Sequence, residues 1–465
     1  MRFLRPFAIL FTGYLLVTLP LQGQAPATDT ISTGLFAITH VYLIPMKGEE
    51  LLPDQTVIVD GGVITKVGPA EKTAVPKGAK VIEGKGMYLM PGLSEMHAHI
   101  PVAENGNDSL VKETLFLYLA NGVTTIRGML GAPYHLQLKK QVATGEILGP
   151  RIYTASPSLN GQTVQTMEEA RNKVARYKTE GYDFLKIHPG LTIENFDEIV
   201  KTARRVNIPF SGHVPTQVGI AHAIASGYAS IDHMDGYLEG LVPASDKTNP
   251  DAGGFFGFNY TELANTNLIP QLASKTKAAK TWVVPTESLL ERWTSSRSAD
   301  EFLAEPAMQY MPPATRYQWR LSKQTFSAAP EYSVDRAAKF VTLRQKILRG
   351  LNRSKVGLLL GSDSPQVLNV PGFSIHQEMQ AMAKAGIPAL VILKSGTVNP
   401  SIFFDEVGKY GVVQKGASAD LVLMRANPLE NVANAQQIAG VMVRGSWLPK
   451  AYIDAQLAAI AVKYQ

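Results

Sequence analysis

Two histidines separated by a single residue form the first group in the sequence that could bind a metal. His97 and His99 end an apolar run, and on an extended strand side chains two residues apart point to the same side. A divalent ion needs such converging nitrogens, although His-x-His alone is a weak signal. The chemistry indicated by this pair is therefore binding of a metal ion through imidazole nitrogens. Side chains of ligand type also end four other apolar runs: Lys186, His213, His233 and Asp363.

Each of these residues also has an ordinary structural explanation. Lys186 interrupts the apolar run 183–188, and a buried amine costs several kcal/mol unless it is paired, neutralised or able to reach the rim. A lone histidine at a strand end is more often structural, and Asp363 could cap a helix or a turn. Together these structural explanations are insufficient, because residues of a metal-ligand type recur at the ends of five separate apolar runs.

The elements that would position these residues form a repeating pattern. Between about Gly92 and Val398 eight strand-like runs alternate with helical stretches, which predicts an α/β fold, a (β/α)8 TIM barrel. The C-terminal strand ends of such a barrel form its active face. The stretch from Glu287 to about Ser354 is too long for one connection, so we expect extra helices there that reach over the barrel mouth. The predicted strands end near His99, Arg127, Ala155, His188, His213, His233, Thr286 and Asp363.

Short β runs precede and follow the predicted barrel. They cover 36–44, 56–59 and 63–67 on one side, and 419–424 and 438–443 on the other. Because buried strands need partners, we predict that the two sets form one small β-sandwich domain. A terminal helix is expected from Lys450 to Val462. The predicted organisation is a signal segment at 1–27, the first sandwich part at 28–91, the barrel at 92–398, and the second sandwich part with the helix at 399–465.

The composition narrows the choice of metal and of partner. The 465 residues include nine histidines and no cysteine, which excludes thiolate zinc sites, iron–sulfur clusters and cysteine nucleophiles. Any metal must therefore be held by nitrogen and oxygen. The net charge of +6 comes with no dense basic block, so nucleic acid is not an expected partner.

The first 27 residues are typical of a secretory signal. Arg2 and Arg5 precede a largely apolar run at 7–21, and small residues follow at 25–27. The alternative is an uncleaved anchor, but the run is short for a bilayer span of roughly 20 residues. We therefore predict an exported protein, periplasmic or secreted, with no stable membrane span after cleavage.

Several motifs together resemble the amidohydrolase superfamily. Pro91-Gly92-Leu93 precedes the two histidines, and His213, His233 and Asp363 follow in that superfamily's order. Residues 121–126 and 415–423 resemble its second barrel strand and its returning sandwich strand. The resemblance extends from about residue 34 to the C-terminus. Between 181 and 233 the chain is similar to the branch that contains imidazolonepropionase-like enzymes, metal-dependent prolidases and ochratoxin-type amidases.

The resemblance implies a role for each ligand. Lys186 would react with CO2 to give N6-carboxylysine, whose two oxygens bridge two divalent ions, and this removes the cost of a buried ammonium. Zinc is the expected metal, with manganese and cobalt as alternatives. The more buried ion would be bound by His97, His99 and Asp363, and the more exposed ion by His213 and His233.

The implied reaction is hydrolysis of a C–N amide or peptide bond in a dipeptide or N-acyl amino acid. A metal-bridging hydroxide would attack the carbonyl, and Asp363 would serve as base and then as acid. A lactonase or phosphotriesterase is an alternative. A second alternative applies if Lys186 is not carboxylated: a mononuclear site with imidazolonepropionase-like or deaminase chemistry. An exported binding protein is disfavoured, because every ligand is present.

Residues that could contact the substrate are less clearly marked. Arg127 could clamp a substrate carboxylate, and a structural role is an equal alternative for this residue and for the others. Relatives in this branch carry a Gly-Gly-His segment after the third strand, whereas 158–163 lacks histidine. The oligomeric state is left open, although a homo-oligomer is common for such barrels. The candidates for substrate binding are Arg127, His135, His188, Tyr237 and His376.

Overall fold

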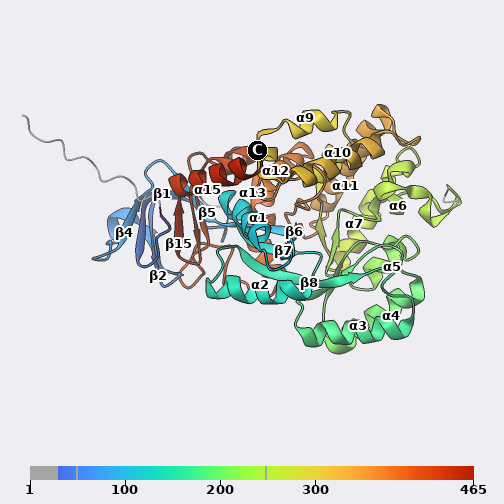
Figure 1. Cartoon of the computed structure of the whole chain (residues 1–465), viewed down its shortest axis with the longest axis horizontal. Coiled ribbons are helices and arrows are strands. Elements are labelled where there is room, and N and C mark those ends of the chain that lie inside the picture. The colour runs from blue at the N-terminus through green and yellow to red at the C-terminus, as the bar shows by residue number, and fades with distance from the viewer. Residues whose placement is uncertain (1–29, 49–50, 247–248) are drawn as a thin grey trace, which may run out of the picture.

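Seven parallel strands form the wall of a barrel. The computed structural model describes residues 30–48, 51–246 and 249–465, and Figure 1 shows the strands and the helices that alternate with them. The strands pair in chain order, as expected for successive right-handed βα units. They are β6 (Leu93–Ala98), β7 (Val123–Gly128), β8 (Arg151–Leu159), β9 (Phe184–Ile187), β10 (Phe210–Gly212), β11 (Ser230–Asp232) and β12 (Trp282–Val284).

The eighth position of the barrel is occupied by residues 356–364. Leu358 bridges Val283 of β12, and Ser364 bridges Ala98 of β6, so this run lies between the last strand and the first. It is too irregular to form a continuous ladder, yet it closes the gap. The predicted (β/α)8 barrel is therefore confirmed.

The helices outside the barrel begin and end where the sequence provides caps. Thr166 and Thr192 accept the N–H groups that open α3 and α4, and Gly181 ends α3 in the left-handed region. The barrel strands are buried on both faces, which explains why they read as apolar runs without alternation. These helices are α1 (Ser109–Ala120), α2 (Pro133–Thr144), α3 (Met167–Glu180), α4 (Ile193–Val206), α5 (Gly219–Ala225), α6 (Tyr237–Gly240) and α7 (Ile269–Ala278).

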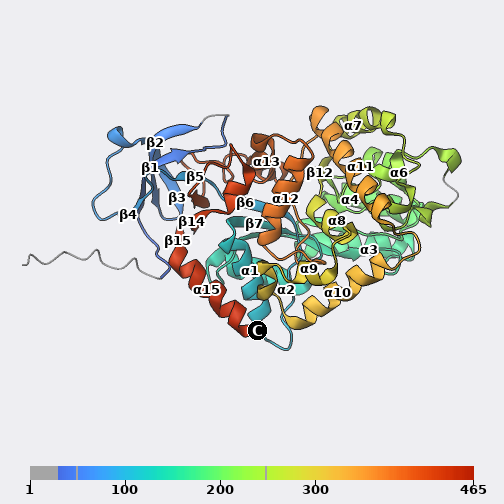
Figure 2. The ribbon, with the colours of Figure 1, turned by 90° about the horizontal axis from the view of Figure 1, so that it is seen from above.

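Two long excursions leave the barrel. The expected extra helices after β12 are present as α8 (Glu287–Thr294), α9 (Ala299–Leu303), α10 (Pro313–Ser327) and α11 (Val334–Arg353). The other excursion, between β11 and β12, was not predicted. It contains α6, α7 and a series of 3-10 turns, among them η4 (Phe255–Tyr260), and Figure 2 shows α6, α7 and α11 gathered at one end of the molecule.

The N- and C-terminal segments meet in one sheet of eight strands, as predicted for the domain beside the barrel. The strands follow the order β15-β14-β13-β5-β1-β2-β3, with β4 also paired to β1. The antiparallel pair of β5 and β13 joins the two segments. The strands are β1 (Phe36–Leu43), β2 (Leu52–Asp60), β3 (Val63–Pro69), β4 (Lys80–Glu83), β5 (Tyr88–Pro91), β13 (Leu421–Met424), β14 (Ile438–Val443) and β15 (Ser446–Pro449).

Three further helices follow the eighth barrel run, and one closes the chain. They are α12 (Phe373–Lys384), α13 (Ala389–Ser395), α14 (Val398–Phe403) and the predicted terminal helix α15 (Lys450–Lys463). The predicted signal segment at 1–27 lies outside the described residues. Within the described part of the chain, no helix has the length and apolar character needed to cross a membrane.

Glu378 of α12 is a fully buried carboxyl that should make stability depend on pH. Its Oε2 accepts the N–H of Ser288 at 2.7 Å, but burial raises its pKa from 4.5 to about 8. In the unfolded chain this carboxyl loses its proton from about pH 4.5 upward, whereas in the folded chain it keeps the proton until about pH 8. The free energy of unfolding therefore falls as the pH rises between these two values. The slope should reach roughly 1.4 kcal/mol per pH unit.

We expect Glu378→Gln to flatten this decline in stability, as measured by chemical unfolding between pH 5 and 9. The exposed carboxyl of Glu71 provides a control, since Glu71→Gln should leave the wild-type profile unchanged. Equal slopes in wild type and Glu378→Gln would rule out Glu378 as the source of the decline.

Candidate metal centre

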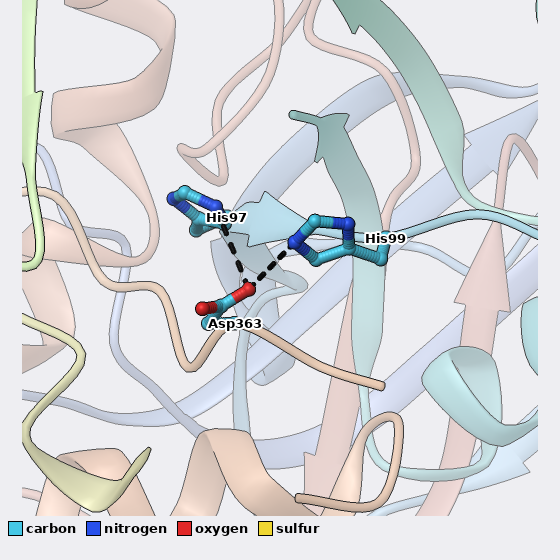
Figure 3. A group of neighbouring side chains, drawn as sticks. All are labelled: His97, His99 and Asp363. Atoms are coloured by element: carbon cyan, nitrogen blue, oxygen red, sulfur yellow. Dashed lines mark ion pairs between the residues drawn. The ribbon is translucent and has the colours of Figure 1, made fainter. Parts of the chain in front are cut away.

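Three ligand-type side chains from the two ends of the barrel sheet meet at one point. His97 and His99, at the end of β6, both turn Nε2 toward Asp363, which follows the eighth run (Figure 3). The distances from Nε2 to the Asp363 carboxylate oxygen Oδ1 are 3.5 Å and 2.7 Å respectively. The aspartate is held in the left-handed region, at φ 62°, so its direction is fixed by the surrounding packing.

Glu95, which the sequence reading missed, joins the two strands that carry these ligands. Its Oε1 accepts the N–H of His97 at 2.9 Å and the N–H of Ser362 at 2.8 Å. The Ser362 hydroxyl donates to the other carboxylate oxygen. Because one buried side chain bonds both β6 and the eighth run, it sets the distance between the two histidines and Asp363.

Two more histidines extend the cluster from the neighbouring strands. The His233 ring centroid is 4.4 Å from that of His97 and 4.6 Å from that of His213. His233 directly follows β11, and His213 directly follows β10. The structure therefore brings together all four histidines that were predicted as ligands.

In three of these histidines the other ring nitrogen faces an oxygen, which orients the imidazole. Nδ1 of His97 lies 3.0 Å from Oδ2 of Asp232, and Nδ1 of His213 lies 3.0 Å from Oδ2 of Asp235. Nδ1 of His233 lies 3.0 Å from the hydroxyl of Thr286. An oxygen beside Nδ1 is typical of metal-binding histidines, in which Nε2 is left to bind the ion. Asp232, Asp235 and Thr286 were not predicted, although all lie within three residues of a predicted strand end.

Lys186 of β9 lies inside the barrel with no solvent exposure, and its Nζ has no hydrogen-bond partner. Burial lowers the pKa of Lys186 to about 8, although Asp232 and Asp363 oppose that change. The strand beside it has Gly212, where a Cβ would come within 3.1 Å of the lysine Cδ. The site thus holds an unpartnered buried amine among carboxylates and imidazoles.

The donor set fits metal ions. Burial lowers the pKa of both His97 and His233 well below 6.5, and lowers that of His213 to about 3, so these rings are neutral. The His97 lone pair on Nε2 then points at a carboxylate oxygen, Oδ1 of Asp363, that has no hydrogen-bond partner of its own. Two atoms with lone pairs repel each other at this distance unless a proton or a cation lies between them, and a metal ion would meet that need. The nitrogen and oxygen ligands suit zinc or a similar divalent ion.

Arg127 is placed under the site, where a substrate does not reach it. It has no solvent exposure, and its guanidinium donates to Asp232 at 3.0 Å, to the Ser230 hydroxyl at 2.9 Å and to the carbonyl of Met96 at 2.6 Å. The expected clamp on a substrate carboxylate is therefore not what this geometry provides. Arg127 instead fixes Asp232, which in turn faces His97.

The other predicted substrate contacts divide by location. His188 lies at the mouth: its ring is 5.0 Å from that of His213, and its Nδ1 is 2.5 Å from the Ser158 hydroxyl. His135 of α2 is buried, with Nε2 3.3 Å from the carbonyl of Pro101. Tyr237 is also buried and bonds Thr276 through its hydroxyl.

His376 lies away from the strand tips. Its Nε2 is 3.1 Å from the carbonyl of Asn121, just before β7 begins, so it belongs to the opposite end of that strand. Of the five predicted contacts, His188 alone has a ring against a predicted ligand among the described ring pairs.

The fold and the site together define a class of (β/α)8 barrels in which the strand tips carry side chains of metal-ligand type. The chain belongs to the amidohydrolase family, which matches residues 88–448. It is 26% identical over 196 residues to an imidazolonepropionase of Idiomarina loihiensis, covering 42% of this chain and 43% of that protein. It is 24% identical over 242 residues to adenine deaminase 3 of Rhizobium meliloti, covering 48% and 38%. These alignments span less than half the length of each relative.

Solved structures of similar shape support the fold assignment. A Xaa-Pro dipeptidase with bound methionine has a TM-score of 0.67 at 18% identity, covering 90% of this chain and 100% of that one. Bottromycin amidohydrolase has a TM-score of 0.68 at 22% identity, covering 92% and 90%. At such identities the likeness shows the shared barrel architecture alone.

Asp235 should tune the affinity of the outer half of the site. Asp235→Asn keeps the side-chain volume but replaces the carboxylate that faces Nδ1 of His213 with an amide. We therefore expect one ion to bind about 10- to 100-fold more weakly, with the fold intact. Competition with a chromophoric chelator measures this. The exposed pair of Asp197 and His222, 2.7 Å apart, supplies the matched control Asp197→Asn. Equal affinities in both variants would contradict the role of Asp235.

Proposed function

We propose that the protein is an exported, zinc-dependent hydrolase of C–N amide bonds, with dipeptides or N-acyl amino acids as its substrate type. The observation that carries the proposal is the convergence of six ligand-type side chains on one end of the barrel, with the buried amine of Lys186 among them. The similar proteins support this proposal, since they include a Xaa-Pro dipeptidase and imidazolonepropionases.

The six residues divide into two sets of ligands. His97, His99 and Asp363 would hold the inner ion, and His213 with His233 would hold the outer one. Lys186, as N6-carboxylysine, would supply one oxygen to each. Carboxylation accounts for the unpartnered Nζ, because it replaces an ammonium with an anion that has metal partners. When bound, the ions activate water for attack and polarise the substrate carbonyl.

The protein's own groups perform the remaining steps. Asp363 accepts the proton of the attacking water on its carboxylate and then delivers it to the leaving nitrogen. Burial keeps the imidazoles neutral, and Asp232, Asp235 and Thr286 hold the rings in place through Nδ1. Water is restricted because most ligands are almost fully buried, with His99 the most open at 21% side-chain exposure.

A substrate panel tests the proposal. Purified protein, with its metal content measured by elemental analysis in the presence and absence of bicarbonate, is offered dipeptides, N-acyl amino acids, cyclic amides and lactones. Cleavage of the first two classes with about two ions per chain is expected. Cleavage of lactones without amides would overturn it.

A mononuclear cyclic-amide hydrolase is a second candidate, favoured by the similarity to imidazolonepropionases. One ion per chain, unaffected by bicarbonate, together with turnover of cyclic amides would establish it in place of the first. Export is tested separately, by sequencing the N-terminus of the protein recovered from outside the cytoplasm.

A further inference from the structure

One aromatic side chain outside the ligand set lies against the metal centre. The centroid of the Phe256 ring is 5.3 Å from that of His233 and 5.9 Å from that of His213. Side-chain exposure is 21% for His99 and 14% for His213, but only 1% for His97 and His233, so the centre opens on the side of His99 and His213. Phe256 borders that opening.

The backbone holds this ring in place against its local preference. Phe256 has φ 49° and ψ 39°, in the left-handed region that a phenylalanine rarely adopts, and Gly257 follows at φ 76°. A residue in this conformation persists only where its surroundings impose it, and such residues concentrate at functional sites. The conformation turns the ring toward the histidines.

The surroundings that impose it are aromatic. Phe255, whose ring is 4.8 Å from that of Phe256, lies 4.8 Å from Trp293 of α8 and 5.2 Å from Phe326 of α10. Phe258 is buried and packs 5.3 Å from Phe340 of α11. The two long excursions thus meet in one aromatic cluster whose innermost ring faces the ligands.

We propose that Phe256 determines substrate specificity by packing against an apolar, preferably aromatic, acyl group attached to the scissile carbonyl. This inference rests on the proposed amide hydrolysis. There, the leaving nitrogen must lie near Asp363, whose Oδ1 faces His97 and His99. The acyl group, which is the other substituent of the carbonyl, then extends toward the mouth of the centre, where the Phe256 ring lies against His233 and His213. Aromatic rings pack favourably against one another, so Phe256 should bind an acyl group that carries a ring better than a small acyl group.

The test compares N-acetyl, N-hexanoyl and N-phenylacetyl derivatives of a single amino acid. In wild type, kcat/KM should be highest for the phenylacetyl substrate. Phe256→Ala should lower that preference over acetyl about tenfold, mainly through a higher KM for the phenylacetyl substrate. The preference of Phe256→Leu for phenylacetyl over acetyl should lie between those of wild type and Phe256→Ala, because leucine keeps apolar volume but has no ring.

Binding provides a second readout that does not depend on turnover. Phenylacetate, the acyl product, should bind wild type about tenfold more tightly than Phe256→Ala by calorimetry, while acetate shows no difference. Phe404→Ala is the matched control, because that half-buried ring stacks on Tyr153 at 3.6 Å, outside the aromatic cluster around Phe256.

Equal losses for acetyl and phenylacetyl ligands, or no loss at all, would overturn the role of Phe256. If wild type cleaves no amide, the proposed function fails by itself, and the binding comparison still decides whether Phe256 selects aromatic acyl groups.

Discussion

Asp363→Asn is expected to lower kcat by about 10³-fold or more while most of the metal stays bound. An asparagine keeps a carbonyl oxygen as a ligand at the same position, so the inner ion retains His97, His99 and one oxygen donor. The amide cannot accept a proton, and general base catalysis by a positioned carboxylate contributes about 10²- to 10⁴-fold. The measurement pairs kcat on the best amide substrate with elemental analysis of the same sample.

Loss of activity through misfolding or metal loss must be separated from loss of proton transfer. Thermal unfolding and bound metal of Asp363→Asn should both resemble those of wild type while kcat falls. Asp300→Asn, at an exposed carboxylate that pairs with Arg320, should change none of these quantities. An Asp363→Asn enzyme with near wild-type turnover and full metal would show that another group moves the proton.

Lys186→Ala is the second substitution expected to have a large effect, because it removes the proposed bridge between the ions. Bound metal should drop from about two ions per chain to about one, and kcat should fall at least about 10³-fold. The truncation leaves a cavity lined by ligands, into which a small carboxylate can bring two oxygens. Added formate, acetate or propionate should therefore restore part of both the metal content and the activity, in proportion to concentration.

The protein contains a second buried lysine that serves as a control. Lys323 of α10 donates to the carbonyls of Trp293 and Ser295 and lies outside the ligand cluster. Lys323→Met should lower stability, yet leave metal content unchanged and show no response to carboxylates. If Lys186→Ala keeps two ions, or if carboxylates have no effect on it, the carboxylated bridge is wrong.

The barrel and its ligands could be predicted because both depend on local patterns. Apolar runs of strand length, followed by His97, His213 or His233, mark the strand tips without knowledge of the rest of the chain. Parallel strands bring their C-terminal ends to one face, so the convergence follows from the strand count. The eighth run was found for the same reason, although it pairs only through isolated bridges.

Residues whose role depends on side-chain direction could not be predicted. Arg127 ends a strand, which suggested a substrate contact, but the barrel closes around it and pairs it with Asp232. Glu95 acquires its role only when β6 lies beside a run that is distant in sequence, and Asp235 only when the ends of β10 and β11 lie side by side. Phe256 lies in an excursion without strand or helix periodicity, and its direction comes from three helices supplied by later parts of the chain.

The pairing of β5 with β13 has a consequence for how the molecule is assembled. Leu89 of β5 is matched to Leu423 of β13, so an entire barrel is synthesised between two partners in one ladder. Contacts of such long separation form late and slowly, because the intervening chain must first become compact. Until then β5 presents an unpaired edge of the kind that promotes aggregation, and a chain cut short before β13 would keep that edge permanently. The C-terminal strands thus complete the sheet beside the barrel, and by covering the edge of β5 they also protect the N-terminal strands from aggregation.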